Sequence, residues 1–250
     1  MKNRRIESLK LNTLLVDFDP ENGGYQRKLN KSDVSRGVKS FNIALVDTPL
    51  IAKRPNGDLF IVDGQHTRAI LIGVGIDTFQ CNVMDSTGRT EEAPVFIACN
   101  EPKTGGVNVK PYDRYIAGIS CQHPTYLKIR DLMNTVDVAI SNNRNPSYQH
   151  TNAIGTIQDL INLSSLPIAL KFIKETWPTD NYSWSADMIK GCTMFISKLS
   201  NTQIDTASKK LKKKTCAEII SKSESIARAL DKHKRNCVPD VLRSLSGCVL

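Results

Sequence analysis

Long apolar runs are missing from this sequence. A helix that spans a bilayer needs roughly 20 consecutive apolar residues, whereas the apolar runs here are short, as between residues 70 and 76. The charged opening MKNRRIESLK is not followed by the apolar core of a secretory signal. We therefore expect neither a membrane protein nor an exported one, and no membrane partner.

Paired cysteines are missing as well. The seven cysteines form an odd set without a Cys-x-x-C motif, and none lies at zinc-finger spacing from a histidine. His123, His150 and His233 are scattered along the chain, so they form no ligand pattern for a metal. The pattern excludes zinc ribbons and disulfide scaffolds, and it predicts reduced thiols in the cytosol and no metal site.

Aromatic residues make up only 6% of the chain, and its net charge of +9 is concentrated in one segment. Residues 208–236 hold ten Lys and Arg against three Asp and Glu, which gives +7. Five of these cations lie within six residues: Lys209, Lys210, Lys212, Lys213 and Lys214. Such a segment is either a solvated helix end or a contact surface for DNA, and both interpretations stay open. It has no interleaved aromatic residues to stack on bases.

The first part of the chain mixes strands with helices. Asn56-Gly57 between two apolar runs predicts a β-hairpin, because both residues tolerate positive φ. Asn30 or Ser32 is a suitable helix N-cap, and Pro111 a suitable first helical residue. The expected strands cover residues 14–18, 49–54, 59–62 and 79–84, and the expected helices about 32–41, 67–73 and 91–100. Gly105-Gly106 marks a loop.

From about residue 112 onward the sequence has helical periodicity only. The expected helices cover residues 111–121, 124–136, 150–163, 167–177, 186–199, 215–230 and 238–245. We therefore predict an α+β fold with two domains, a strand-and-helix domain over 1–115 and an all-helical domain over 116–250 that contains the basic segment 208–236. Trp177 and Trp184 flank a loop, and we expect them to pack in a core or at its rim.

The hairpin runs directly into the hexapeptide Asp63-Gly64-Gln65-His66-Thr67-Arg68. Gly64 suits a tight strand-to-helix turn, after which the free N–H groups of the first helical turn attract an anion. His66 and Arg68 add donors, and Gln65 can contact a ribose or a base edge, so phosphate is the natural ligand. In the alternative interpretation Asp63 and Thr67 only cap the helix and His66 is a surface group.

The order of these motifs resembles a known family. Four features in this order look like the N-terminal domain of the ParB/sulfiredoxin superfamily. They are Tyr25-Gln26-Arg27, an intervening helix, Pro49-Leu-Ile, and the hairpin that leads into Phe60-Ile-Val-Asp-Gly-Gln-His-Thr. More narrowly, the chain is similar to ParB-like proteins with a DGQH signature, often encoded by phages and mobile elements. The likeness covers roughly residues 11–115. It implies a small mixed sheet with helices, nucleotide and DNA as partners, and a bacterial or phage-infected host cytosol; a homodimer stays open.

The resemblance also carries individual residues. In ParB the corresponding turn reads Gly-Glu-Arg-Arg and binds the triphosphate of CTP; here Gly64, Gln65, His66 and Thr67 stand in its place, with Arg68 one position later. This leaves a nucleoside triphosphate with Mg²⁺ as the cofactor to consider. The later Glu-Asn-x-x-Arg box has its counterpart around Asn100, but its arginine is unmatched and Lys103 is the nearest cation. Sulfiredoxin requires a cysteine where Gln65 stands, which excludes sulfinic-acid reduction.

Two arginines and one alternative function complete the expectations. Arg27 either clamps the phosphate or forms an ion pair with Asp63. Arg54, beside the hairpin turn, is expected to be a solvated charge at a strand end. The alternative to a binding protein is a ParB-like nuclease or nucleoside triphosphatase, in which His66 is the general base or a phosphate ligand and Asp63 orients it.

Overall fold

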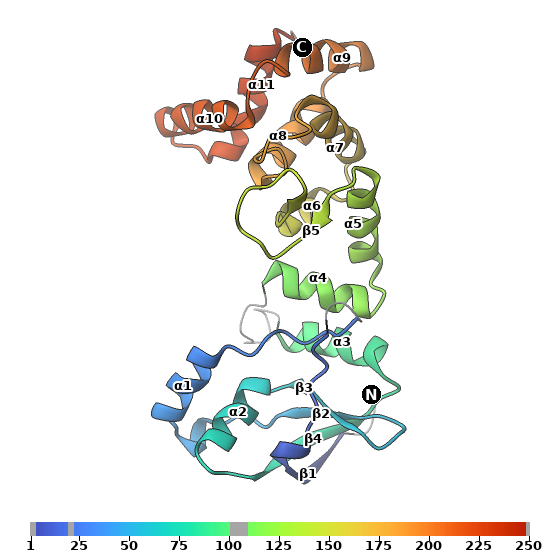
Figure 1. The fold of residues 1–250 in the computed structure, drawn as a ribbon, viewed down its shortest axis with the longest axis vertical. Coiled ribbons are helices and arrows are strands. Elements are labelled where there is room, and N and C mark those ends of the chain that lie inside the picture. Colours follow the sequence, from blue (N-terminus) through green and yellow to red (C-terminus); the bar gives the residue numbers. More distant parts are fainter. Residues whose placement is uncertain (1–3, 20–22, 101–109, 249–250) are drawn as a thin grey trace. The chain divides into compact units, whose positions relative to one another are not determined.

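The structure is a computed structural model, and it describes residues 4–19, 23–100 and 110–248. The chain divides into two compact units, Met1–His123 and Pro124–Leu250, which we treat separately (Figure 1). Residue 115, where the sequence suggests a boundary, lies inside helix α4 (Pro111–Ser120). This helix packs on α3 (Arg89–Cys99) and therefore belongs to the first unit.

The first unit is built on a mixed four-stranded sheet. Its strands are β1 (Arg4–Lys10), β2 (Leu50–Lys53), β3 (Leu59–Asp63) and β4 (Thr78–Asp85), in the order β1-β4-β2-β3. β2 and β3 form the antiparallel hairpin predicted from Asn56-Gly57, β1 pairs antiparallel with β4, and β2 runs parallel to β4. Together with the helical second unit, this sheet confirms the predicted α+β class.

Helices cover both faces of this sheet, because its central strands alternate their buried side chains between two cores. Ile51, Ile61 and Val83 face one core, to which α2 (Gln65–Gly73) contributes Leu71. α1 (Lys31–Lys39) packs on α2. The opposite face packs against α3 and α4, which contribute Ala93, Phe96 and Ala117 to the second core.

The outer edge of β3 is covered by the segment before α1. Leu15 pairs with the strand through two backbone hydrogen bonds, to the carbonyl of Leu59 and from the N–H of Ile61. Only this bridge is found where the sequence suggests a strand over residues 14–18. The side-chain amide of Gln26 donates to the carbonyls of Ile61 (2.9 Å) and Val62 (2.7 Å). These contacts fix the course of the chain just before Arg27.

A cluster of buried charges ties this segment to the rest of the unit. The Arg54 guanidinium pairs with Asp17 at 2.7 Å and with Glu92 of α3 at 2.5 Å, and these carboxylates are 3% and 0% exposed. It also lies over the ring of Phe60, 3.6 Å from the centroid. Arg54 is thus not the solvated strand-end charge expected from its position beside a turn, since two distant carboxylates draw it inward.

The second unit consists almost entirely of helices. Its helices are α5 (Pro124–Thr135), α6 (Ile154–Leu160), α7 (Ser165–Thr176), α8 (Ala186–Ile196), α9 (Asn201–Leu211), α10 (Cys216–Leu230) and α11 (Val238–Ser246), with a 3₁₀ turn, η4, at Lys234–Asn236. The buried helix α8 packs against α6, α7, α10, α11 and η4. Two short strands, β5 (Ala139–Ile140) and β6 (His150–Thr151), pair in parallel.

Several local expectations for this unit need correction. His150 lies on a strand rather than at a helix start, and α9 occupies a segment for which no helix was predicted. α9 has few apolar residues, but it begins with a capping box formed by Ser200 and Gln203. Trp177 and Trp184 are both buried, as core packing requires.

Two further features of the described chain bear on its chemistry. All seven cysteines are free thiols. Among the helices of the described residues, none combines the length and the hydropathy that a bilayer crossing requires.

We expect replacement of Arg54 by leucine to lower the free energy of unfolding of the first unit by about 3–5 kcal/mol, because it leaves the buried Glu92 without its cation and leaves Asp17 with Arg89 alone. Urea denaturation followed by circular dichroism measures this loss. Arg5→Leu is the control, since the ion pairs of Arg5 with Glu7 and Asp85 lie near the surface and are worth about 1 kcal/mol or less. Equal losses in the two variants would contradict a central role of the buried cluster.

Candidate functional site

The turn between β3 and α2 requires glycine at position 64. Gly64 has φ +94° and ψ 20°, in the left-handed region, and a Cβ there would lie 2.9 Å from the Cβ of Pro49. The first intrahelical bond of α2 runs from the Arg68 N–H to the Gly64 carbonyl at 2.9 Å. The backbone N–H groups of residues 65–67 therefore have no partner within the helix and are free to bind an anion.

Arg27 lies near this turn because its two predecessors are anchored. Tyr25 is fully buried and packs on Phe96, and Gln26 is held by the β3 carbonyls. The charge of Arg27 acts on two groups: after burial it further lowers the pKa of His66, and with Lys110 it opposes the burial that raises the pKa of Asp113. Among the described residues Arg27 has no ion pair, with Asp63 or any other carboxylate. Its guanidinium is thus available to a ligand.

His66 links the starts of α1 and α2. Its Nε2 accepts a hydrogen bond from the backbone N–H of Asn30 at 3.2 Å, while the Asn30 side chain caps α1. Burial lowers the pKa of His66, and the nearby Arg27 charge lowers it further, against a smaller opposite effect of Asp33. A neutral imidazole that accepts at Nε2 carries its proton on Nδ1. His66 can therefore donate to an anion, but its acceptor nitrogen is already occupied.

Asp63 and Gln65 flank the turn on its two sides. The hydrogen bond of His66 is with Asn30, and no hydrogen bond joins the imidazole to Asp63 in the described chain. Asp63 instead lies close enough to Cys99 for its charge to contribute to the raised pKa of that thiol, after burial. The Oε1 of Gln65 is buried and has no hydrogen-bond partner in the described part of the chain. A buried acceptor without a partner destabilises a fold, which makes the Gln65 amide a natural contact for a bound donor.

The remaining motif residues have mixed surroundings. The Arg68 Nε donates to the carbonyl of Leu11 at 2.6 Å, and burial lowers its pKa. Asn100 ends α3, is 4% exposed and donates from Nδ2 to the carbonyl of Phe96 at 2.8 Å. Thr67 is half-buried in the first turn of α2. The structure thus brings Arg27, Gly64, Gln65 and His66 together, whereas Arg68 and Asn100 make structural contacts. Lys103 lies outside the described residues, as do Gly105 and Gly106.

Asp113 is a member of this neighbourhood that the motif did not indicate. It lies in the first turn of α4, half-buried. Burial raises its pKa, and the charges of Lys110 and Arg27 oppose that effect. A signal was present in the sequence, because an acidic residue two positions after Pro111 is typical of a helix start. Its proximity to Arg27 required the tertiary fold.

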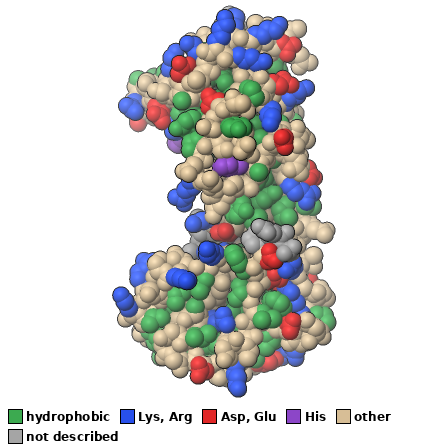
Figure 2. Space-filling view, in the orientation of Figure 1, with side chains coloured by type: hydrophobic (Ala, Val, Ile, Leu, Met, Phe, Trp, Pro, Cys, Tyr) green, Lys and Arg blue, Asp and Glu red, His purple; other side chains and the backbone are tan. Residues whose placement is uncertain are grey.

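The basic segment forms a second, separate feature. Lys209 and Lys210 end α9, and Lys212, Lys213 and Lys214 form the turn before α10; all five side chains are exposed. None has an ion pair within the described residues. Figure 2 shows Lys and Arg side chains gathered over the helices at this end of the second unit.

The backbone of this lysine turn is held firmly. The Trp177 indole donates to the carbonyl of Lys214 at 2.8 Å, and the N–H of Cys216 donates to Asp180 at 2.8 Å. Thr215 then caps α10 in a capping box with Glu218. The five ammonium groups therefore project from a fixed backbone, and the turn cannot rearrange to move these like charges apart.

Two other cations of the basic segment are neutralised. Lys234 pairs with Glu224 (2.9 Å) and Asp187 (3.1 Å), and Arg235 pairs with Asp187 (3.3 Å). The unpaired positive charge is thus concentrated at the lysine turn. No group of three His, Cys, Asp or Glu side chains that could hold a metal ion occurs among the residues the structure describes.

Comparison with known proteins adds a family. A model described as a family of unknown function, DUF6551, matches residues 21–243. No curated protein matches the chain. Among solved structures, it is similar to the C-terminally truncated chromosome-partitioning protein ParB from Caulobacter crescentus complexed with CTP-gamma-S, at 12% identity and a TM-score of 0.33. That match covers 83% of this chain and 98% of that chain. At this TM-score no residue role is transferred between the two.

The lowered pKa of His66 predicts an acid-sensitive first unit. As the pH falls below about 6.5, the unfolded state takes up the His66 proton before the folded state does, so stability decreases until the folded pKa is passed. In His66→Gln, which keeps an acceptor for the Asn30 N–H, this part of the decrease should disappear. Thermal unfolding between pH 8 and pH 5 measures it, with the exposed His123→Gln as control. An unchanged pH profile in His66→Gln would show that His66 is not the responsible group.

Proposed function

The chain belongs to the family of unknown function DUF6551, and we propose that it is a nucleic-acid-binding protein whose first unit holds the phosphate groups of a nucleotide. The nucleotide site is the Gly64 turn with Arg27, and the nucleic-acid surface is the lysine turn formed by residues 209–214. The observation that carries the nucleotide site is Arg27, a guanidinium without an ion pair among the described residues, close to the start of α2.

The nucleotide site combines three kinds of donor. The backbone N–H groups of residues 65–67 have no partner among the described residues, the imidazole of His66 presents its Nδ1–H, and Arg27 can bind two phosphate oxygens at once. The buried, unpartnered oxygen of Gln65 suits a ribose hydroxyl or a base amino group. Together these groups fit a phosphate ester better than a carboxylate, because a phosphate has enough oxygen atoms for all the donors.

The identity of the nucleotide is a separate question, for which the family resemblance gives a starting point. Residues 11–115 resemble the N-terminal domain of the ParB/sulfiredoxin superfamily, and in ParB itself the corresponding turn, Gly-Glu-Arg-Arg, binds CTP. CTP with Mg²⁺ is therefore the first nucleotide to test, before ATP, GTP and the deoxynucleotides. The residues of the turn favour binding over hydrolysis, because the acceptor nitrogen of His66 is occupied by Asn30.

The lysine turn supports a contact with the nucleic-acid backbone. Five exposed ammonium groups on a fixed turn repel one another unless an anion lies near them, and a phosphate backbone supplies several anions at short spacing. The absence of aromatic residues from positions 208–236 favours binding through phosphates over stacking on bases. DNA is the nucleic acid that we propose, and binding should depend weakly on sequence.

The nucleotide site can be tested by thermal stabilisation. We expect CTP with Mg²⁺ to raise the unfolding temperature of the intact chain, since a ligand at 100 times its Kd contributes about 2.7 kcal/mol. Arg27→Gln should abolish this shift. Lys28→Gln is the matched control, because it removes the same charge from the neighbouring, exposed position.

The nucleotide screen has a clear negative outcome. If CTP, ATP, GTP and the deoxynucleotides all leave the unfolding temperature unchanged, the first unit has no nucleotide site and acts as an interaction domain. If a shift occurs but is equal in the chain and in Arg27→Gln, the nucleotide binds elsewhere.

The nucleic-acid surface can be tested by the salt dependence of DNA binding. Each phosphate contact contributes about 0.9 to the slope of log K against log salt concentration, so replacing all five lysines of the turn by glutamine should reduce the slope by up to about 4.5. Fluorescence anisotropy with a labelled duplex measures the slope. The fold should be retained, because the bonds that hold the turn use backbone atoms of Lys214 and Cys216.

A charge-matched variant separates local contact from net charge. Replacing five exposed lysines elsewhere removes the same total charge; suitable positions are Lys10, Lys39, Lys53, Lys128 and Lys171. This variant should keep most of the slope. Equal slopes in the two variants would mean that the lysine turn is not the binding surface.

A further inference from the structure

A pocket of about 340 Å³ lies within the second unit, separate from both proposed sites. Its walls come from α8 and the residues just after it, from η4 and from α11. The two helices approach closely because of Gly191. A Cβ at this residue of α8 would lie 2.1 Å from Cγ1 of Val238, the first residue of α11. The pocket is thus bounded by tightly packed elements.

The walls of the pocket carry a strong excess of positive charge. Lys190 and Lys198 come from the α8 side, and Arg235 and Arg243 from η4 and α11, against the single carboxylate of Asp240. Lys190 and Lys198 have no ion pair within the described part of the chain. Four cations around one small cavity repel one another, so a bound anion would stabilise the arrangement.

The two arginines are held in place without being saturated. Arg235 pairs with Asp187 at 3.3 Å, and Nη1 of Arg243 pairs with the exposed Asp240 at 3.3 Å. The Nε of Arg243 is buried and donates to no group among the described residues. A buried N–H without an acceptor destabilises the folded state. Arg243 is therefore a fixed guanidinium with unused donors.

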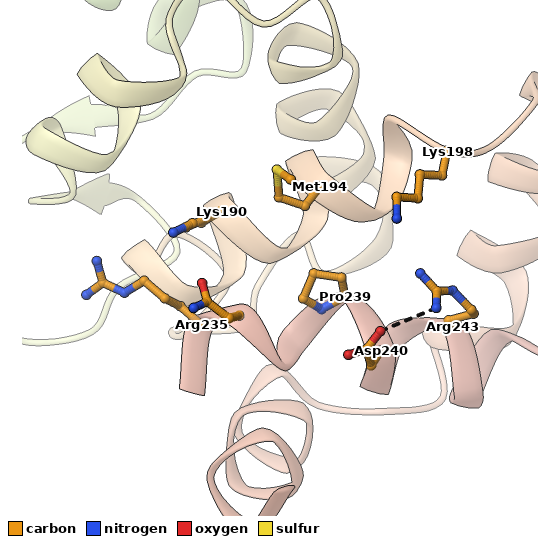
Figure 3. Close-up of a pocket in the computed structure, with 8 residues that line it drawn as sticks. Lys190, Met194, Lys198, Arg235, Pro239, Asp240 and Arg243 are labelled. Carbon is orange, nitrogen blue, oxygen red and sulfur yellow. Dashed lines mark hydrogen bonds and ion pairs between the residues drawn. The ribbon is translucent and has the colours of Figure 1, made fainter. Parts of the chain in front are cut away.

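The side chains divide the pocket into three parts (Figure 3). Lys198, just after α8, extends toward Arg243 at one end, and Lys190 and Arg235 lie at the other. Met194 and Pro239 lie between these pairs and form an apolar middle. Lys190, Met194 and Lys198 are four residues apart and so follow one face of α8 and its extension. Two cationic ends with an apolar centre suit a ligand that has an anionic group on an apolar or aromatic body.

We propose that this pocket binds a small phosphate ester of about the size of a nucleoside monophosphate. Lys198 and Arg243 hold the phosphate, and Met194 and Pro239 contact the body of the ligand. Lys190 and Arg235 donate hydrogen bonds to its more distant oxygen atoms. The volume lies near the lower end of the range of about 300–1,000 Å³ that is usual for small-molecule sites.

This site does not depend on the nucleotide site of the first unit or on the lysine turn. It shares no residue with either, and its proposed ligand is a free small molecule rather than a nucleic-acid backbone. A failure of the nucleotide or DNA experiments therefore leaves the proposal standing, and the reverse is also true.

Methyl-labelled methionine NMR on the intact chain tests the site directly. Met194 lies in the pocket and is 40% exposed, whereas Met84, Met133 and Met188 are at most 4% exposed. We expect AMP, CMP, GMP or UMP to shift the Met194 methyl signal and to leave the signals of Met84 and Met133 in place. Met194→Leu assigns the signal. Inorganic phosphate, which has no body to contact Met194, should bind more weakly than the mononucleotides.

Matched variants identify the residues that hold the phosphate. Lys198→Gln and Arg243→Gln should each weaken the binding of the mononucleotide by about tenfold, as the loss of one charge-assisted hydrogen bond does. Lys171→Gln is the control, because it removes the same charge from an exposed position of α7 outside the pocket. Arg27→Gln should keep the Met194 response, which separates this site from that of the first unit.

Three results would overturn the proposal. The first is a Met194 signal that none of the four mononucleotides moves. The second is an equal loss of affinity in Lys171→Gln and Lys198→Gln, which would reveal general charge screening. The third is a Met194 signal that moves only with a DNA duplex, since the pocket would then be part of a nucleic-acid surface.

Discussion

The ion cluster of Arg54 with Asp17 and Glu92 is the interaction on which the first unit depends. Arg54 follows β2, Glu92 belongs to α3, and Asp17 lies in the segment that covers the edge of β3. The cluster therefore joins the sheet, a covering helix and an irregular segment that has little regular structure of its own. Because both carboxylates are buried, each would be costly to leave without a cation.

The position of the candidate nucleotide site follows from this cluster through one backbone hydrogen bond and the adjacent residues of the chain. The backbone carbonyl of Asp17 accepts the N–H of Gln26 at 3.0 Å. Burial, and after it the nearby charge of Glu92, raises the pKa of the Tyr25 hydroxyl and keeps it neutral. Tyr25 and Gln26 thus lie between the ion cluster and β3, and Arg27 is the next residue. A substitution of Arg54 would therefore shift Arg27, a hydrogen-bond donor of the candidate site, through this segment and not through direct contact.

Those parts of the fold that depend on neighbouring residues could be predicted from the sequence. The hairpin at Asn56-Gly57, the turn at Gly64 and the Asn30 cap are decided within a few residues, and the structure contains all three. The helix α9 was missed because its sequence is mostly polar and its start depends on a capping box. β1 was missed because its pairing partner, β4, lies about seventy residues further along the chain.

The candidate sites divide in the same way. The motif around Gly64 predicted a helix start with free N–H groups, since this needs only local geometry. Three other contacts join segments that are distant in sequence, and local patterns could not predict them. They are the hydrogen bond from Asn30 to His66, the proximity of Asp113 to Arg27, and the ion pair of Arg54 with Glu92. The pocket between α8 and α11 has no motif at all, because its cations come from three elements that only the tertiary fold brings together.

The two anion surfaces of the second unit differ in rigidity and in shape. At the lysine turn, the backbone is fixed, but the exposed lysine side chains can move and salt screens their charges. In the pocket, the two arginine side chains are held by Asp187 and Asp240. The first arrangement suits a long polyanion, which can adjust to it, and the second suits a ligand of defined size.

The bond between Trp177 and the lysine turn also gives the chain an optical probe. The sequence contains two tryptophans, and only the Trp177 indole donates to the turn, whereas Trp184 donates to the carbonyl of Tyr148. The emission of an indole depends on the polarity and hydrogen bonding around its ring. A change at the lysine turn should therefore alter the Trp177 contribution to the intrinsic fluorescence of the chain, without any attached label.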